Sequence, residues 1–399
     1  MTKLYRSVTL ILMAFLLYGC PEHWRQAIKS GSITQKQFNT KIDINIKNSL
    51  VIVPIKVENK TYQFLLDTGA PFSISKELQD EFKFKTVSKG TLRDSDNSQI
   101  TVDYVKIPAI ELNDVIFKDQ VAFVGDFNKN PIIECLGIDG IIGSNMMRFC
   151  NWKIDAKNKI IQISNEEFKL QYHDSIKMKF KPNGQYSIKI QTHLGKSKLT
   201  NLTLDYGSNG GITVPQRIYD TLTNRNIVKK SILEYGVASS GLGGQLKKIN
   251  RKFSRVDSLA LGNVISNNVP IKIGKSGLLG TEVLSKHIVV INWSSFSLAF
   301  EKYPNQTTEA YKTFGVKIGM KNNNYFVSAI IKDSPAEKAG IKPNMKALHY
   351  NSVDFTTDSY CDYINYLNTT KTDNLLLLLA NENGQEQSFQ LEKSAMLLD

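Results

Sequence analysis

The chain repeats one pattern of strands, loops and glycines twice, and this repeat limits its fold more than any other feature. In the first copy an apolar strand ends at Asp67-Thr68-Gly69, and the element Gly140-Ile141-Ile142-Gly143 follows later. In the second copy an apolar strand ends at Asp205-Tyr206-Gly207-Ser208, and Gly277-Leu278-Leu279-Gly280 follows. The interval from the aspartate to the last glycine differs by a single residue between the copies. Self-similarity of this kind predicts two structurally equivalent units.

Both copies have the residue pattern of β-strands. β-Branched and polar residues alternate, turns are short, and no long stretch has helical periodicity. A glycine after each aspartate permits a tight turn that leaves the carboxylate at the tip of a loop. One Asp-x-Gly triplet is typical of an ordinary hairpin turn, but two in equivalent places indicate a functional pair. We therefore expect an all-β-dominated chain in which Asp67 and Asp205 act together.

The segment Leu65-Leu66-Asp67-Thr68-Gly69-Ala70, with Ile141-Ile142-Gly143, resembles the signature of retropepsin-like and pepsin-like aspartic proteases. The resemblance covers about residues 46 to 303 and implies a two-lobed acid-protease-like β-barrel fold, with one lobe at 46–166 and the other at 167–303. Tyr206 departs from the Thr or Ser that the family has at this position. The resemblance implies two catalytic residues and four residues that contact substrate, namely Asp67 and Asp205, and Thr68, Gly69, Gly207 and Ser208.

This family hydrolyses peptide bonds with a water molecule that two aspartates activate. Two carboxylates about 3 Å apart share one proton, so the ionised one accepts a proton from water while the other polarises the carbonyl. Neither a metal nor a cofactor is expected, and the substrate is a peptide or protein. The sequence has no His-Glu-x-x-His and no Gly-x-Ser-x-Gly, which argues against other common hydrolase classes.

Two other interpretations of the aspartate repeat remain open. Tyr206 motivates the first, a catalytically inactive two-lobed lipoprotein that binds extended peptides or glycopeptides. In the second, only the first lobe is catalytic, and Asp67 completes its pair in a homodimer, as in the viral relatives. In either case, residues 90–99 and 239–245 are glycine-containing hairpins placed where they could cover a substrate.

The cysteines leave their pairing undecided. Cys135 and Cys150 flank the Gly140–Gly143 element, and export would allow them to form a disulfide. Two buried thiols are the alternative, because the sequence gives no geometry. The four cysteines lack the spacing of a zinc site.

Residues 304–399 change pattern and resemble a PDZ domain, an α+β fold. Ser334-Pro335-Ala336 begins a short helix that stops at Gly340, with sound start and stop chemistry. The resemblance implies that the loop Phe314-Gly315-Val316 receives the carboxylate of a C-terminal peptide ligand. The alternative is a packing module that binds no peptide, because a fold alone does not establish function.

The amino terminus predicts export. Lys3 and Arg6 precede an apolar run over 8–18, which is too short to span a membrane and is typical of a signal peptide at 1–19. Leu17-Tyr18-Gly19-Cys20 resembles the bacterial lipobox, which implies lipidation of Cys20. The polar residues that follow predict a tether over 20–45. The expected location is the cell envelope, with the protein lipid-anchored to a bacterial membrane at the periplasmic face or cell surface. An ordinary signal peptide is the alternative.

The net charge of +13 does not indicate a nucleic-acid partner. Lys and Arg number 50 against 37 Asp and Glu, but they are spread along the chain without an arginine-rich run. A nucleic-acid interface would need a clustered basic footprint.

Overall fold

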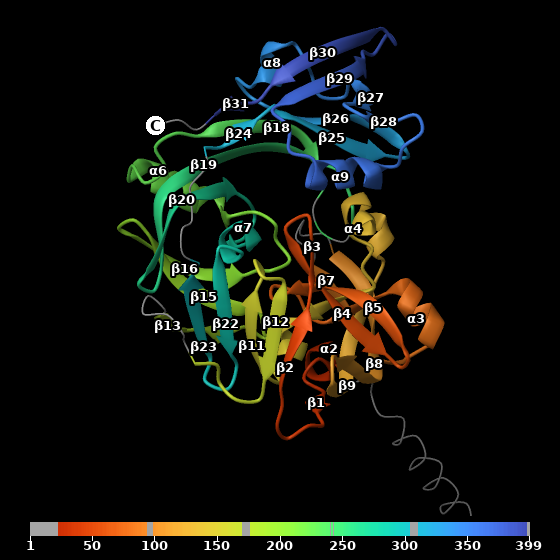
Figure 1. Ribbon diagram of the computed structural model, residues 1–399, viewed down its shortest axis with the longest axis vertical. Helices are drawn as coiled ribbons and strands as arrows, with labels where there is room; N and C mark the ends of the chain where they lie inside the picture. Colours follow the sequence, from red (N-terminus) through yellow and green to blue (C-terminus); the bar gives the residue numbers. More distant parts are fainter. Residues whose placement is uncertain are drawn as a thin grey trace, which may run out of the picture.

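Strands dominate the computed structural model, which describes residues 23–93, 99–169, 176–239, 241, 243–303 and 310–396 (Figure 1). The structure is 52% strand and 14% helix, so the predicted all-β-dominated class is confirmed. Residues 1–22, with the predicted signal peptide and Cys20, lie outside the described part.

The first repeat folds around a nine-stranded sheet that carries the Asp67 loop. Its strand β10 (Gly140–Gly143) runs parallel to β5 (Lys60–Asp67), so that Gly143 lies opposite Asp67. The other strands of this sheet are β1 (Ser32–Ile33), β3 (Asn45–Lys47), β4 (Leu50–Val57), β6 (Ser73–Ser75), β7 (Lys85–Arg93), β8 (Gln99–Leu112) and β9 (Val115–Gly125). Its helices are α3 (Lys76–Phe82), η1 (Phe127–Lys129), α4 (Pro131–Leu136) and α5 (Ser144–Met147).

The second repeat has the same crossing at its own aspartate. Strand β21 (Leu278–Leu279) runs parallel to β16 (Ser197–Leu204), with Leu279 opposite Leu204. The remaining strands are β14 (Lys181–Pro182), β15 (Ile188–Leu194), β17 (Ile212–Val214), β18 (Ile232–Ala238), β19 (Lys247–Leu261) and β20 (Val264–Ile273), and the helices are α6 (Gln216–Asn224) and α7 (Thr281–Leu284).

A third sheet joins the two repeats. Strand β11 (Asn151–Asp155) follows the first repeat and pairs with β22 (His287–Asn292) of the second, with Trp152 opposite Ile291. The other strands are β2 (Asn39–Asp43), β12 (Ile160–Ser164), β13 (Ile176–Lys179) and β23 (Ser297–Lys302). One apolar core runs through both repeats and this sheet, so the lobes are packed as one body.

The predicted tether over 20–45 is wrong for the residues that the structure describes, because residues 23–45 pack onto the first lobe. Helix α2 (Trp24–Ala27) places Trp24 against Tyr104, with ring centroids 5.8 Å apart. Strand β2 pairs with β12, where Ile42 lies opposite Ile161. Ala27, Ile28, Ile42 and Ile44 are buried, and their burial stabilises the packing of this segment although most of its residues are polar.

The C-terminal domain, residues 310–396, is a smaller α+β unit with its own apolar core. Ser334 caps α8 (Pro335–Lys338) by accepting a hydrogen bond from the Glu337 N–H, as its sequence predicts. Its elements in order are β24 (Lys312–Thr313), β25 (Val316–Lys321), β26 (Asn324–Ile331), α8, β27 (Lys346–Tyr350), β28 (Val353–Asp354), α9 (Tyr360–Thr369), β29 (Asn374–Ala380), β30 (Glu386–Glu392) and β31 (Ser394–Ala395).

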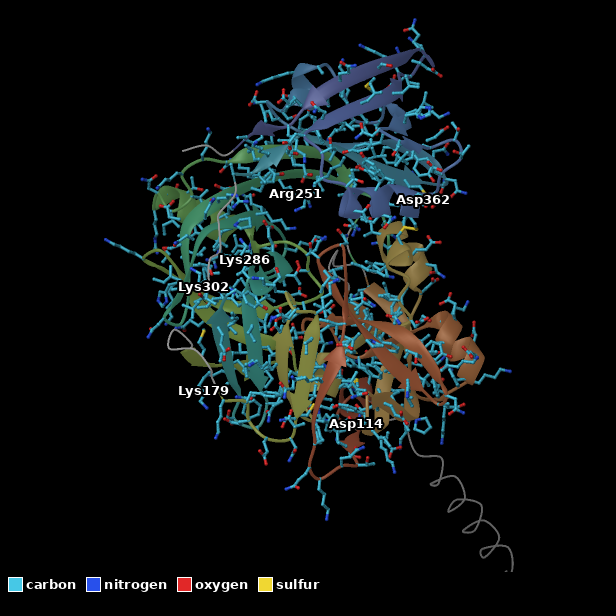
Figure 2. The ribbon with its side chains drawn as sticks, in the orientation of Figure 1. Asp114, Lys179, Arg251, Lys286, Lys302 and Asp362 are labelled. Carbon is cyan, nitrogen blue, oxygen red and sulfur yellow. A yellow bond between two sulfur atoms is a disulfide. The ribbon has the colours of Figure 1, made fainter. Side chains whose placement is uncertain are left out.

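The C-terminal domain is attached to the second lobe through a continuous sheet. Strand β26 pairs with β18, and Glu234 of β18 lies opposite Ile331. The Glu234 carboxylate is 3% exposed and forms ion pairs with Lys317 and with Arg251, the latter at 2.5 Å. Arg251 is labelled where β19 meets the C-terminal domain in Figure 2.

A disulfide attaches the same domain to the first lobe. It joins Cys135 of α4 to Cys361 of α9, and Cys150 is a buried free thiol. Figure 1 shows α9 at the lower edge of the C-terminal domain, with α4 of the first lobe beneath it. The suggested Cys135–Cys150 disulfide is therefore wrong: Cys150 is enclosed in the main apolar core, whereas α4 faces the C-terminal domain.

We expect Cys361→Ser to lower the thermal stability of the protein, by an amount on the order of 2 kcal/mol, because the disulfide closes a very long loop of the unfolded chain. Differential scanning calorimetry of wild type and variant, each with and without reductant, measures the effect. Reductant should lower the melting temperature of the wild type and leave that of the variant unchanged. A wild-type transition that is insensitive to reductant would contradict the prediction.

Candidate active site

The Asp67 loop and the Asp205 loop occupy equivalent places above the crossing strands. Asp67 is the last residue of β5. Asp205 follows β16 directly, and its N–H extends the pairing of β16 with β21 by donating to the Leu279 carbonyl at 2.9 Å. Glycine is required at the crossing, because a Cβ on Gly143 would overlap the backbone of the Asp67 loop at Pro71 and Phe72. The sequence pattern of aspartate loop and Gly-apolar-apolar-Gly strand therefore places each carboxyl at the junction of the lobes.

The two carboxyl groups meet directly. Asp67 and Asp205 are hydrogen-bonded to each other through their side chains. Each also packs on the glycine of the opposite loop: a Cβ on Gly69 would lie 3.0 Å from Asp205 Oδ1, and a Cβ on Gly207 would overlap Asp67 Oδ2. Gly69 and Gly207 thus permit the approach of the two loops, and either side chain would push the carboxyls apart.

The environments of the two carboxyls differ in hydrogen bonding. Asp67 Oδ1 accepts the Gly69 N–H at 2.7 Å and the Ala70 N–H at 3.1 Å. Among the described residues, Asp205 Oδ1 accepts one backbone N–H, that of Gly207 at 2.9 Å. Each N–H stabilises the ionised form of the carboxyl that it contacts. Asp67 is therefore the better site for the negative charge.

The pKa shifts follow the same asymmetry. Burial raises the pKa of Asp67 above its ordinary value, and three hydrogen bonds oppose that rise. Burial raises the pKa of Asp205 well above its ordinary value, and the charge and the hydrogen bond of Asp67 raise it further. The pair shares one proton, which resides on Asp205 while Asp67 carries the charge.

Thr68 connects the two loops. Its Oγ1 donates to the Leu204 carbonyl at 2.6 Å and accepts the Tyr206 N–H at 3.1 Å, while its own carbonyl accepts from Ser144 Oγ at 2.7 Å. The Thr68 side chain is 0% exposed. Its predicted contact with substrate is therefore wrong, because the hydroxyl is fully used in holding the lobes together.

Tyr206 does not provide the matching connection in the other direction. Its side chain is 1% exposed, and its hydroxyl has no hydrogen-bond partner in the described part of the chain. The charges that raise its pKa, after burial itself, belong to Tyr303 and Asp155, outside the loop. The phenol therefore fills the core, and only the backbone N–H of Tyr206 takes part in the link to Thr68.

Ser208 takes part in the Asp205 loop through its backbone. Its N–H donates to the Asp205 carbonyl at 3.3 Å, and its carbonyl accepts the Thr281 N–H at 2.8 Å. These bonds shape the Asp205 loop. The residue is partly exposed beside the carboxyl pair.

Two residues near the pair were not found from the sequence. Ser187 Oγ donates to the Gly69 carbonyl at 3.0 Å, which adds a further hydrogen bond between the lobes. Lys189 Nζ donates to Thr203 Oγ1 at 2.5 Å, and its charge lowers the pKa of Asp205 against the effect of burial. No motif marks either residue, because a serine and a lysine in a strand and the turn before it are common on any protein surface.

Both predicted hairpins have the flanking strands of a hairpin. The first is built from β7 and β8, and its tip at 94–98 lies outside the described residues. The second is built from β18 and β19, and it reaches the first lobe, where the Gly241 carbonyl accepts from Asn130 Nδ2 at 2.7 Å. Gly244, at φ +62°, lies against Lys129 with no room for a Cβ. The second hairpin therefore bridges the two lobes beside α4.

The loop Phe314-Gly315-Val316 is largely occupied by contacts within the C-terminal domain. The Gly315 N–H donates to Thr313 Oγ1 at 3.0 Å, and Val316 begins the pairing with β26, opposite Ile330. Phe314 is 7% exposed, and Lys393 lies 5.2 Å from its ring centroid. At least one of the N–H groups expected to receive a peptide carboxylate is thus already bonded.

The described residues contain neither a candidate metal site nor a candidate membrane-spanning helix. No group of three or more His, Cys, Asp or Glu side chains there could hold a metal ion. No helix among those residues is both long and apolar enough to cross a membrane.

Comparison with known proteins finds a family match within the first lobe. A family model described as aspartyl protease matches residues 53–146, a span that contains the Asp67 loop and β10 but ends before Asp205. No curated protein matches the chain. An aspartyl-protease-like region therefore occupies the first lobe of this protein.

Proposed function

We propose that this protein is an exported aspartic endopeptidase in which Asp67 and Asp205 of one chain form the catalytic pair. The observation that carries the proposal is the direct hydrogen bond between the two carboxyls at the junction of the lobes. Because Asp67 accepts more N–H groups than Asp205, Asp67 is suited to act as the base and Asp205 as the acid. General acid-base hydrolysis requires both.

The proposed reaction uses both carboxyls in turn. Ionised Asp67 removes a proton from a water molecule, whose oxygen adds to the scissile carbonyl carbon while Asp205 gives its proton to the carbonyl oxygen. The gem-diol then returns a hydroxyl proton to Asp205, the carbon–nitrogen bond breaks, and the proton held by Asp67 moves to the leaving nitrogen. The products are a carboxylic acid and an amine, and the pair recovers its single shared proton.

The two rival functions have less support than the intramolecular pair. A homodimer through the first lobe is not needed, because Asp205 of the same chain already occupies the position opposite Asp67. An inactive binding protein was suggested by Tyr206, but its backbone N–H keeps the bond to Thr68. One missing neutral hydrogen bond, worth about 0.5–1.5 kcal/mol, is too little to separate two packed lobes.

For the C-terminal domain we propose a structural role rather than capture of a C-terminal peptide. Tyr360 Oη donates to the Ile318 carbonyl at 3.2 Å, so α9 already uses an acceptor of β25 that an added peptide strand would approach. The Gly315 N–H is likewise bonded within the domain. The PDZ-like elements then serve to bridge the two lobes.

We expect Asp67→Asn and Asp205→Asn each to reduce peptide hydrolysis by at least about 10²- to 10⁴-fold, because an amide neither accepts the proton of water nor donates one to the carbonyl as an acid does. Asp205→Asn should also raise the free energy of unfolding at pH 7, since it removes a carboxyl that is costly to ionise when buried.

The control for the aspartate variants is Asp80→Asn, at an exposed position of α3. Hydrolysis of an unstructured peptide and urea unfolding are measured on the same preparations. Full activity in a purified Asp67→Asn protein would refute the proposed function.

The pH profile of kcat/KM should be bell-shaped, with both limbs at higher pH than for free aspartate. The rate rises as Asp67 loses its proton and falls as Asp205 loses its proton, and burial raises both pKa values above 3.8. Because both pKa values are higher in the folded protein, protonation of the pair adds to the free energy of unfolding below about pH 4, the pKa of unfolded aspartate. This contribution is lost as the pH rises through the pKa values of the folded protein. A profile governed by a group titrating below pH 3.8 would contradict the assignment.

We also propose that the protein is lipid-anchored at Cys20 in the cell envelope, with the periplasmic face or cell surface as the location. Cys20→Ser should move the protein from the membrane fraction to the soluble exported fraction, because the acyl chains supply the membrane affinity. Cell fractionation and immunoblotting measure the distribution. An unchanged membrane fraction in the variant would count against the anchor.

A further inference from the structure

Lys189 lies on the same face of its sheet as Asp205. It pairs directly opposite Thr203 in the β15–β16 ladder, and Thr203 precedes Asp205 by two residues, so their side chains project from one face. The bond from Lys189 Nζ to Thr203 Oγ1, at 2.5 Å, confirms that Lys189 and Thr203 share that face. The ammonium group therefore stands beside the carboxyl pair, on the side of the second lobe.

The equivalent place in the first lobe is apolar instead of charged. Ile52 pairs with Leu65, and Leu65 precedes Asp67 by two residues. Both side chains are at most 7% exposed and belong to an apolar cluster with Phe127 and Ile141. The Asp67 side of the junction is thus apolar, while the Asp205 side carries a partly exposed cation.

The partners of Lys189 leave its charge without a fixed counter-ion. Thr203 offers a neutral hydroxyl, and no carboxylate of the described residues forms an ion pair with Lys189. Partial burial lowers the pKa of Lys189, and ionisation of Asp205 would oppose that shift. A cation in such a place is stabilised by an anion that arrives next to it.

We propose that Lys189 selects substrates that carry a carboxylate side chain, Asp or Glu, next to the scissile bond on the Asp205 side of the carboxyl pair. This inference rests on the proposed protease function. Lys189 donates a charge-assisted hydrogen bond to the substrate carboxylate and offsets its repulsion by ionised Asp67. The net charge of +13 favours the approach of acidic peptides over basic ones.

Digestion of a random-sequence synthetic peptide library, with sequencing of the products, tests the proposal. Wild type should cleave bonds flanked on one side by Asp or Glu, and matched Glu and Gln peptides should differ in kcat/KM by about 10- to 100-fold. Lys189→Met should remove this preference, Lys189→Arg should retain it, and Lys189→Glu should favour Lys or Arg instead. Lys198→Met, at an exposed position of the same hairpin, is the matched control.

An acidic preference that survives Lys189→Met, or no acidic preference in wild type, would overturn the proposal while leaving the protease function intact. Absence of any cleavage would instead refute the protease function. In that case calorimetric binding of blocked random decapeptides with a central Glu or Gln still decides the role of Lys189, since equal affinity of wild type for both pools rejects it. Lys189→Gln, which keeps a donor for Thr203, replaces Lys189→Met if the latter does not fold.

Discussion

The contact between the carboxyls of Asp67 and Asp205 is the interaction on which the rest of the structure depends. Two carboxylates cannot both be ionised at hydrogen-bond distance, so the contact requires a shared proton and N–H donors that stabilise the remaining charge. Glycines on both loops leave room for it, and Thr68 holds the loops together through two hydrogen bonds. The charge and the proton are therefore placed by the geometry of the two loops.

The position of one lobe relative to the other is fixed from several sides. The β11–β22 pairing and a shared apolar core connect the lobes beneath the carboxyls. The second hairpin contacts Asn130, and the C-terminal domain joins β18 by strand pairing and α4 by the Cys135–Cys361 disulfide. A frame that is connected from several sides suits the proposed catalytic pair, because small displacements of a reacting group are costly.

The two halves of the repeat have diverged where they meet. Thr68 connects the loops while its counterpart Tyr206 fills the core, and Lys189 stands where the first lobe has Ile52. Asp67 accepts two N–H groups and Asp205 one. Each difference breaks the symmetry of the repeat, which gives the two carboxyls different protonation states and the two sides of the junction different polarity.

The sequence by itself determined the strand-rich class, the repeat, the paired aspartates and the caps of α8, because alternation, glycine spacing and capping residues act over short stretches of chain. The tertiary structure alone decided the packing of residues 23–45, the partner of Cys135, the buried role of Thr68 and the place of Lys189. These features join residues that are distant in sequence, and the burial of a side chain depends on the whole surface that covers it.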